Sequence, residues 1–131
     1  MQIGFVAEQS GVSTKTIRYY ESIGLIRQAR RTGSGYRVYA EHDIQTLRFI
    51  QRARGLGFSV NDVAGLLGLW HDDQRASANV KELAESHRAK IDHKIAELRG
   101  MRATLDHLII QCHGDERPEC PILDDLAGET R

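Results

Sequence analysis

The fold is decided by residues 11–39, which read GVSTKTIRYYESIGLIRQARRTGSGYRVY. Ser13 can cap a helix that ends near Gly24, because a hydroxyl side chain satisfies free N–H groups and glycine adopts the left-handed conformation that ends helices. A shorter helical segment, residues 3–9, precedes the glycine break at Gly11. Two short helices joined around a glycine predict a helix-turn-helix.

The second part of this stretch, residues 26–39, places the turn Gly33-Ser34-Gly35 between an arginine-rich arm and a tyrosine-rich arm. A glycine-rich turn between two such arms predicts a small β-hairpin, or wing. Because strands this short are not stable alone, we expect the wing to pack against the neighbouring helices.

Hydrophobic periodicity predicts two further helices after the wing. One covers residues 41–54, and the next begins at Ser59, where Asp62 completes a capping box. Residues 71–76 interrupt the apolar pattern and are interpreted as a connector.

A long helix is predicted over residues 77–111, which contain no proline and a single glycine. Mostly apolar residues recur along it at alternating steps of three and four positions, and they form a stripe typical of a coiled coil. Because the small lobe formed by residues 1–70 cannot cover this stripe, we expect a second copy of the chain and hence a homodimer. The alternative is packing against the third and fourth helices of the same chain. The stripe consists of Val80, Ala84, His87, Ile91, Lys94, Leu98, Met101, Leu105 and Leu108, of which His87 and Lys94 are polar.

The pattern predicts a mainly α protein with four parts. A winged helix-turn-helix DNA-binding lobe covers residues 1–70, and a connector covers residues 71–76. A coiled-coil dimerisation helix covers residues 77–111. Residues 112–131 form a metal-binding loop and a C-terminal helix, which begins near Pro121 because proline is favoured in the first helical turn.

The charges are unevenly distributed although the formal net charge is zero. Residues 1–60 carry nine Lys and Arg against four Asp and Glu, whereas residues 61–131 carry nine against fourteen. The front part therefore has the charge expected of a phosphate-binding surface. No secretory leader is visible and no apolar run reaches membrane-spanning length, so we expect a cytoplasmic protein with no membrane partner.

The candidate DNA-binding surface combines the second helix with the wing. Lys15 and Arg18 can reach base edges or phosphates in the major groove, and hydroxyl groups can contact the DNA backbone. The alternative is a solvated arginine face with the tyrosines in the core. The predicted DNA-binding residues are Thr14, Lys15, Thr16, Arg18, Tyr19, Tyr20, Arg31, Gly35, Tyr36 and Arg37.

The only two cysteines, Cys112 and Cys120, bracket the loop CHGDERPEC. Two thiolates suit a soft monovalent ion, Cu(I) or its analogues Ag(I) and Au(I), whereas Zn(II) prefers four ligands. The same pair could form a reversible disulfide. A thiol enzyme would need an aimed base, and His113 is too close in sequence to serve, so we expect no enzyme.

The segments IGFVA (3–7), GVSTKTIRYYESIGLI (11–26) and RTGSGYRVY (31–39) resemble the MerR family of bacterial transcription regulators. The resemblance implies an antiparallel coiled-coil dimer that binds promoter DNA and acts with RNA polymerase. Family members bend and untwist an over-long promoter spacer when the inducer is bound, which is recognition through DNA deformation.

The spacing of Cys112 and Cys120, followed by PILDDL, resembles the copper-efflux (CueR-like) subgroup. This resemblance implies a Cu(I)-responsive activator with both cysteines as metal ligands. In divalent-sensing relatives a third cysteine comes from the start of the partner's long helix, where this chain has Ser77, and the resemblance adds Lys81 as a nearby cation. The sequence alone favours an ordinary surface lysine at that position. A redox-sensing or a Zn(II)-responsive regulator of the same fold is the alternative.

Overall fold

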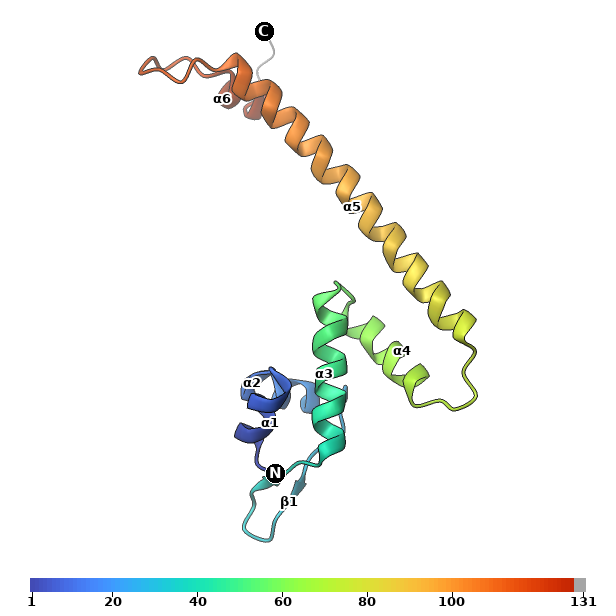
Figure 1. Cartoon of the computed structure of the whole chain (residues 1–131). Helices are drawn as coiled ribbons and strands as arrows, with labels where there is room; N and C mark the ends of the chain where they lie inside the picture. The colour runs from blue at the N-terminus through green and yellow to red at the C-terminus, as the bar shows by residue number, and fades with distance from the viewer. Residues whose placement is uncertain (129–131) are drawn as a thin grey trace. The chain divides into compact units, whose positions relative to one another are not determined.

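The computed structural model describes residues 1–128, which contain six helices and one two-stranded sheet (Figure 1). The described chain divides into two compact units, Met1–Val80 and the part that begins at Lys81. This arrangement confirms the predicted mainly α fold with a winged helix-turn-helix, a long helix and a short final helix. The predicted boundaries between domains stay predictions, and residues 129–131 of the last one lie outside the described residues.

The helix-turn-helix consists of α1 (Ile3–Ser10) and α2 (Thr14–Ser22). Gly11 ends α1 in the left-handed conformation, with φ 76°. The side chain of Ser13 accepts a hydrogen bond from the N–H of Thr16 at 3.1 Å, so the predicted cap is confirmed. The local sequence therefore fixes both the end of α1 and the start of α2.

The wing is formed by β1 (Arg30–Arg31) and β2 (Arg37–Val38), which pair in antiparallel orientation. Gly35 turns the chain with φ 87°, and the N–H of Thr32 donates to the carbonyl of Tyr36 at 2.8 Å. The strands are shorter than the predicted arms because the turn between them takes up residues 32–36.

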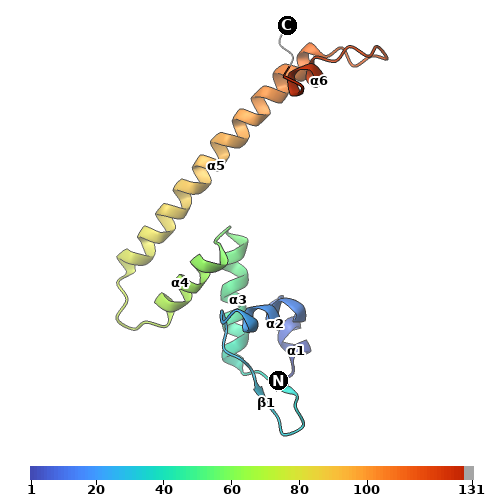
Figure 2. The same ribbon diagram turned by 180° about the vertical axis from the view of Figure 1, so that it is seen from behind.

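α3 (Glu41–Gly55) and α4 (Val60–Trp70) are the remaining helices of the front unit, Met1–Val80 (Figure 2). The predicted capping box at the start of α4 is confirmed, because the side chains of Ser59 and Asp62 each accept a hydrogen bond from the other residue's N–H. The ring of Phe49 on α3 stacks on Trp70 with centroids 4.5 Å apart. The hydrophobic core joins α1, α2, the wing, α3 and α4 through Val6, Val12, Ile17, Tyr20, Ile26, Tyr39, Ile44, Leu47, Ile50, Ala53, Val63 and Leu67.

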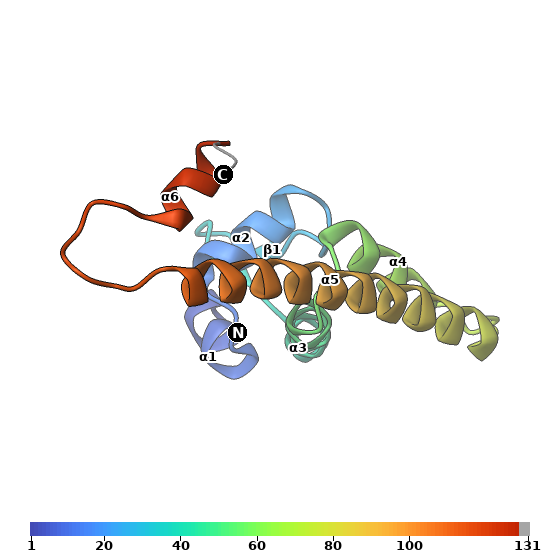
Figure 3. The same ribbon diagram turned by 90° about the horizontal axis from the view of Figure 1, so that it is seen from above.

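The second unit contains most of α5 (Ser77–Gln111) and all of α6 (Pro121–Leu126). The loop after α5 turns back, so that α6 lies beside the last turns of α5 (Figures 1 and 3). Leu108, near the end of α5, is buried. None of the described helices combines the length and the apolar character needed to cross a membrane.

Candidate nucleic-acid interface and metal centre

The outer face of α2 carries several of the predicted DNA-binding residues. The side chains of Lys15, Arg18 and Tyr19 are exposed, and those of Thr14 and Thr16 are half-buried. The hydroxyl of Thr16 also accepts a hydrogen bond from the cap residue Ser13 at 2.8 Å. The helix therefore presents cationic and hydroxyl groups on one side, which is the composition that contacts phosphates and base edges.

Tyr20 is placed differently from the other predicted contacts. Its side chain is only 7% exposed and belongs to the core, and its carbonyl accepts a hydrogen bond from the N–H of Leu25 at 2.9 Å. The alternative of a tyrosine in the core therefore describes Tyr20, whereas Tyr19 and Tyr36 are exposed. A direct contact of Tyr20 with DNA stays a prediction that this burial disfavours.

The wing and α2 meet around a surface depression with a volume of about 350 Å³. It brings together three guanidinium-bearing side chains from α2, β1 and β2, and five of its lining residues belong to the predicted DNA-binding set. Three guanidinium groups around one depression suit an anion such as a phosphate. The lining residues are Gln2, Ile3, Arg18, Arg31, Gly35, Tyr36 and Arg37, of which the sequence did not indicate Gln2 and Ile3.

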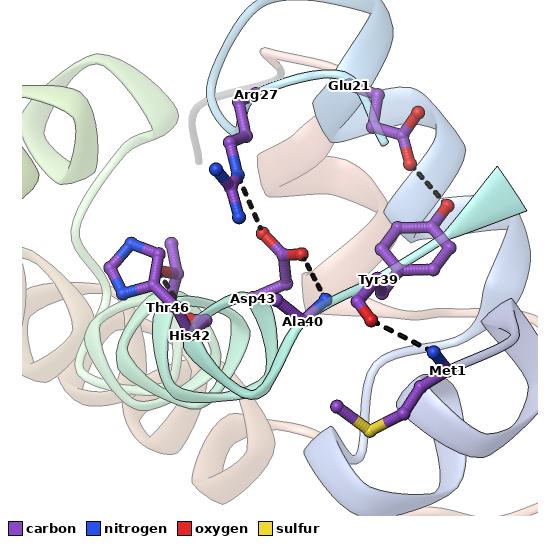
Figure 4. Close-up of polar contacts among 8 residues, drawn as sticks. All are labelled: Met1, Glu21, Arg27, Tyr39, Ala40, His42, Asp43 and Thr46. Carbon is purple, nitrogen blue, oxygen red and sulfur yellow. Dashed lines mark hydrogen bonds and ion pairs between the residues drawn. The ribbon is translucent and has the colours of Figure 1, made fainter. Parts of the chain in front are cut away.

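A buried polar network adjoins this depression. The hydroxyl of Tyr39 donates to Glu21, and Arg37 forms an ion pair with the same carboxylate, with Nε and Oε2 3.8 Å apart (Figure 4 shows the Tyr39 bond). Burial, the hydrogen bond to Glu21 and the charge of Glu21 raise the pKa of Tyr39 to about 12, and Arg37 opposes this shift. Neither Glu21 nor Tyr39 was predicted as a site residue from the sequence, although Glu21 lies four positions after the buried Ile17 and so on the inner side of α2.

The base of the wing is tied to the N-terminus and to α3 (Figure 4). The amino group of Met1 donates to the carbonyl of Tyr39 at 3.0 Å, and the N–H of Tyr39 donates to the carbonyl of Met1 at 2.8 Å. At the start of α3, Asp43 accepts hydrogen bonds from the N–H of Ala40 at 2.8 Å and from Arg27 at 3.3 Å. These bonds hold the wing against the lobe, as its short strands require.

The two cysteines lie at the two ends of the loop between α5 and α6. The N–H of Cys112 donates to the carbonyl of Ile109 at 3.1 Å, which closes the last turn of α5. Cys120 is the residue before α6, and its carbonyl accepts the N–H of Asp124 at 3.1 Å. Both thiols are free and half-buried. Two soft donors on a surface loop fit a soft metal ion.

The loop contains four other side chains that could ligate a metal, His113, Asp115, Glu116 and Glu119. The carboxylate of Asp115 binds the guanidinium of Arg117 at 2.6 Å and also its N–H at 3.0 Å, and these bonds lower the pKa of Asp115. Asp115 is therefore already engaged. Within residues 1–128, no group of three or more His, Cys, Asp and Glu side chains is arranged to hold a metal ion.

Ser77 and Lys81 lie at the start of α5. Lys81 is exposed. It precedes Gln111, the last residue of α5, by 30 positions, which is about 45 Å along a helix. Lys81 therefore cannot reach Cys112 of its own chain.

The second half of α5 exposes a row of apolar side chains, although Leu108 of the predicted stripe is buried within the chain. Leu98, Met101 and Leu105 are each more than half exposed, at 53%, 54% and 51%. The stripe is wider than predicted, because Ile95 and Ile109 extend one of its edges. Exposed apolar side chains of this kind are typical of surfaces that contact another protein, and the homodimer stays a prediction.

Comparison with known families gives two matches. Residues 1–69 match the family described as MerR HTH family regulatory protein, and residues 44–108 match the one described as MerR, DNA binding. The chain is 58% identical over 119 residues to the heavy metal-dependent transcription regulator 1 of Rhizobium meliloti, covering 91% of this chain and 81% of that one. It is 38% identical over 128 residues to the regulator CueR of Salmonella typhimurium, covering 98% and 93%.

Solved structures show the same fold. The regulator PbrR691 from Ralstonia metallidurans, in complex with lead(II), has a TM-score of 0.84 at 31% identity, covering 96% of this chain and 98% of that one. MerR from Bacillus megaterium, in complex with mercury(II), has a TM-score of 0.74 at 30% identity and covers 97% and 99%. HiNmlR, a regulator lacking the sensor domain and bound to promoter DNA, has a TM-score of 0.56 at 25% identity and covers 84% and 83%.

Proposed function

Because the chain belongs to the MerR family of DNA-binding transcription regulators, and so is not an enzyme, we propose that it activates transcription in response to copper(I). The observation that carries this proposal is the pair of free, half-buried thiols, Cys112 and Cys120, at the end of α5. Two thiolates with no third ligand favour a monovalent soft ion over a divalent one.

The proposed metal rests on the ligand chemistry of the two thiols, because the relatives are named for, or are bound to, different metals. The relative at 58% identity is named for heavy metals in general, and the likeness to CueR is weaker, at 38% identity. The lead(II) and mercury(II) complexes make these ions the direct competitors. Ser77, where divalent-sensing relatives are expected to carry a third cysteine, supports Cu(I), because a hydroxyl is a poor ligand for such ions.

A homodimer completes the proposal. The exposed stripe of α5 is a suitable surface for a second α5, and an antiparallel pair would bring Lys81 of one chain toward the cysteine loop of the other. Lys81 would then offset the negative charge of two thiolates with one monovalent ion, which is costly to bury without a cation. This role needs the second chain, since Lys81 lies about 45 Å from the end of its own helix.

The DNA-binding role is assigned to the outer face of α2 and the arginine-lined depression beside the wing. Cys112 and Cys120 would hold the metal, which would order their loop, and the paired long helices would then change their arrangement and pass a twist to the bound promoter. RNA polymerase then uses a promoter whose spacing was unsuitable before, so that the regulator acts through DNA shape.

The test is X-ray absorption on purified protein loaded with Cu(I), together with in vitro transcription. We expect two sulfur ligands, and loss of copper-dependent activation in Cys112→Ser and Cys120→Ser. Ser86→Cys, on α5 away from the loop, controls for an added thiol. A four-coordinate site with nitrogen or oxygen ligands, or full copper activation by Cys112→Ser, would overturn the proposal.

The second candidate is a redox switch with the same fold, which the free state of both thiols permits. Titration of free thiols in metal-free protein, before and after peroxide treatment, distinguishes the redox switch from the copper(I) sensor. An unchanged thiol count contradicts the redox switch, and a loss of both thiols with a matching transcriptional response favours it over copper sensing.

A further inference from the structure

A buried acid beside a basic surface calls for an explanation. Glu21, in the last turn of α2, is only 4% exposed. It borders the depression lined by Arg18, Arg31 and Arg37, which is the surface that should attract DNA. A carboxylate is costly to bury and opposes phosphate binding, so its presence needs a compensating interaction.

The partners of Glu21 hold it in a single orientation. One oxygen accepts a hydrogen bond from the hydroxyl of Tyr39, a residue that is 3% exposed and whose backbone is paired with Met1 (Figure 4). The other oxygen lies 3.8 Å from Nε of Arg37. The carboxylate therefore connects α2, the base of the wing and a cationic side chain of β2.

Arg37 is the member of this network that can reach a ligand. Its side chain is 27% exposed and lines the depression together with Arg18 and Arg31. Its guanidinium contacts Glu21 through Nε and also interacts with the hydroxyl of Tyr39, while the exposed part of the side chain faces the depression. Guanidinium groups bind phosphates in a forked geometry. Holding a long side chain in its binding conformation lowers the entropy lost on binding.

We propose that Glu21 is a positioning residue, which holds Arg37 in place for a DNA backbone phosphate in the depression between α2 and the wing. This inference rests on the proposed DNA-binding function. The rival role for Glu21 is simple neutralisation of Arg37, and the two roles predict opposite signs. If Glu21 positions Arg37, removing its charge weakens DNA binding, and if it only neutralises Arg37, removing its charge strengthens binding.

The experiment measures binding to a fluorescently labelled DNA duplex of mixed sequence as a function of salt. Phosphate contacts dominate such binding, so the unknown operator is not needed. The variants are Glu21→Gln, Arg37→Gln and the double variant. Glu8→Gln is the matched control, since Glu8 is an exposed acid on α1 of the same lobe.

We expect Glu21→Gln and Arg37→Gln each to weaken binding about five- to tenfold, because a positioned, charge-assisted contact is lost. The double variant should bind no more weakly than Arg37→Gln. In Glu21→Gln, Arg37→Gln and the double variant, the slope of log affinity against log salt should become shallower by up to about 0.9. That is the change expected when one phosphate contact is lost. Glu8→Gln should bind as tightly as wild type or slightly tighter.

The other outcomes are distinct. Stronger binding by Glu21→Gln, or additive losses in the double variant, overturns the positioning role while leaving DNA binding intact. If the wild-type protein fails to bind at low salt, the proposed function itself is overturned. Should Glu21→Gln unfold, Glu21→Asp decides between the two roles. The shorter side chain keeps the negative charge but withdraws the carboxylate from Arg37, so weakened DNA binding supports positioning and wild-type binding contradicts it.

Discussion

The guanidinium of Arg48 on α3 donates two hydrogen bonds to the carbonyl of Gln9 in α1, at 3.0 and 2.9 Å. These bonds satisfy a carbonyl near the C-terminal end of α1, where helical partners are missing. We expect Arg48→Ala to lower the free energy of unfolding by about 1 kcal/mol. Thermal unfolding followed by circular dichroism measures this, and the exposed Arg52→Ala should change stability little.

Tyr39 gives a prediction about alkaline pH. Its pKa is raised from 10.0 to about 12, so the folded state favours the neutral phenol. This contribution to stability is complete below pH 10 and is lost as the pH rises through about 12. The unfolding free energy of wild type should therefore fall more steeply over this range than that of Tyr39→Phe. At neutral pH, Tyr39→Phe should cost about 2 kcal/mol, since Glu21 loses a donor. Parallel curves would contradict this account.

Ser77→Cys should change metal selectivity. If the start of the partner's α5 lies at the cysteine loop, a thiol there supplies a third soft ligand for a divalent ion. We expect mercury(II) and lead(II) to bind at least about tenfold more tightly, as one added ligand contributes more than about 1.4 kcal/mol. Competition titrations measure this change. If Ser86→Cys produced the same gain, position 77 would have no special role.

Leu98→Glu tests the dimer. Leu98 is 53% exposed in the single chain, so the substitution should leave the helix content unchanged. In a paired stripe the new carboxylate would be buried without a partner, and we expect dimer dissociation at concentrations at least about tenfold higher. Sedimentation equilibrium measures this. Ala96→Glu, which is exposed and off the stripe, is the control, and equal effects of the two substitutions would place the interface elsewhere.

The sequence predicted element boundaries well where a local interaction sets them. Ser13 and Ser59 cap helices through bonds to N–H groups three positions ahead, which is a pattern visible in the chain itself. It did not predict contacts between distant segments. The rings of His42 and His71 lie 5.6 Å apart, although their spacing in the chain gives no sign of this.

The candidate site divides in the same way. Cys112 and Cys120 were found from residue type and spacing, because metal ligation depends on chemistry that the sequence displays. The outward positions of α2 followed from helical periodicity. Glu21 and Tyr39 were missed because their pairing depends on how the wing packs against α2, which no local pattern records.

The stack of Phe49 on Trp70 supplies a built-in optical reporter. Trp70 is the only tryptophan and ends α4, immediately before the connector to α5. Its fluorescence therefore reports on the front unit, while the cysteines belong to the unit that begins at Lys81. A change in tryptophan emission on adding Cu(I) would show, without any label, that the signal has passed from one unit into the other.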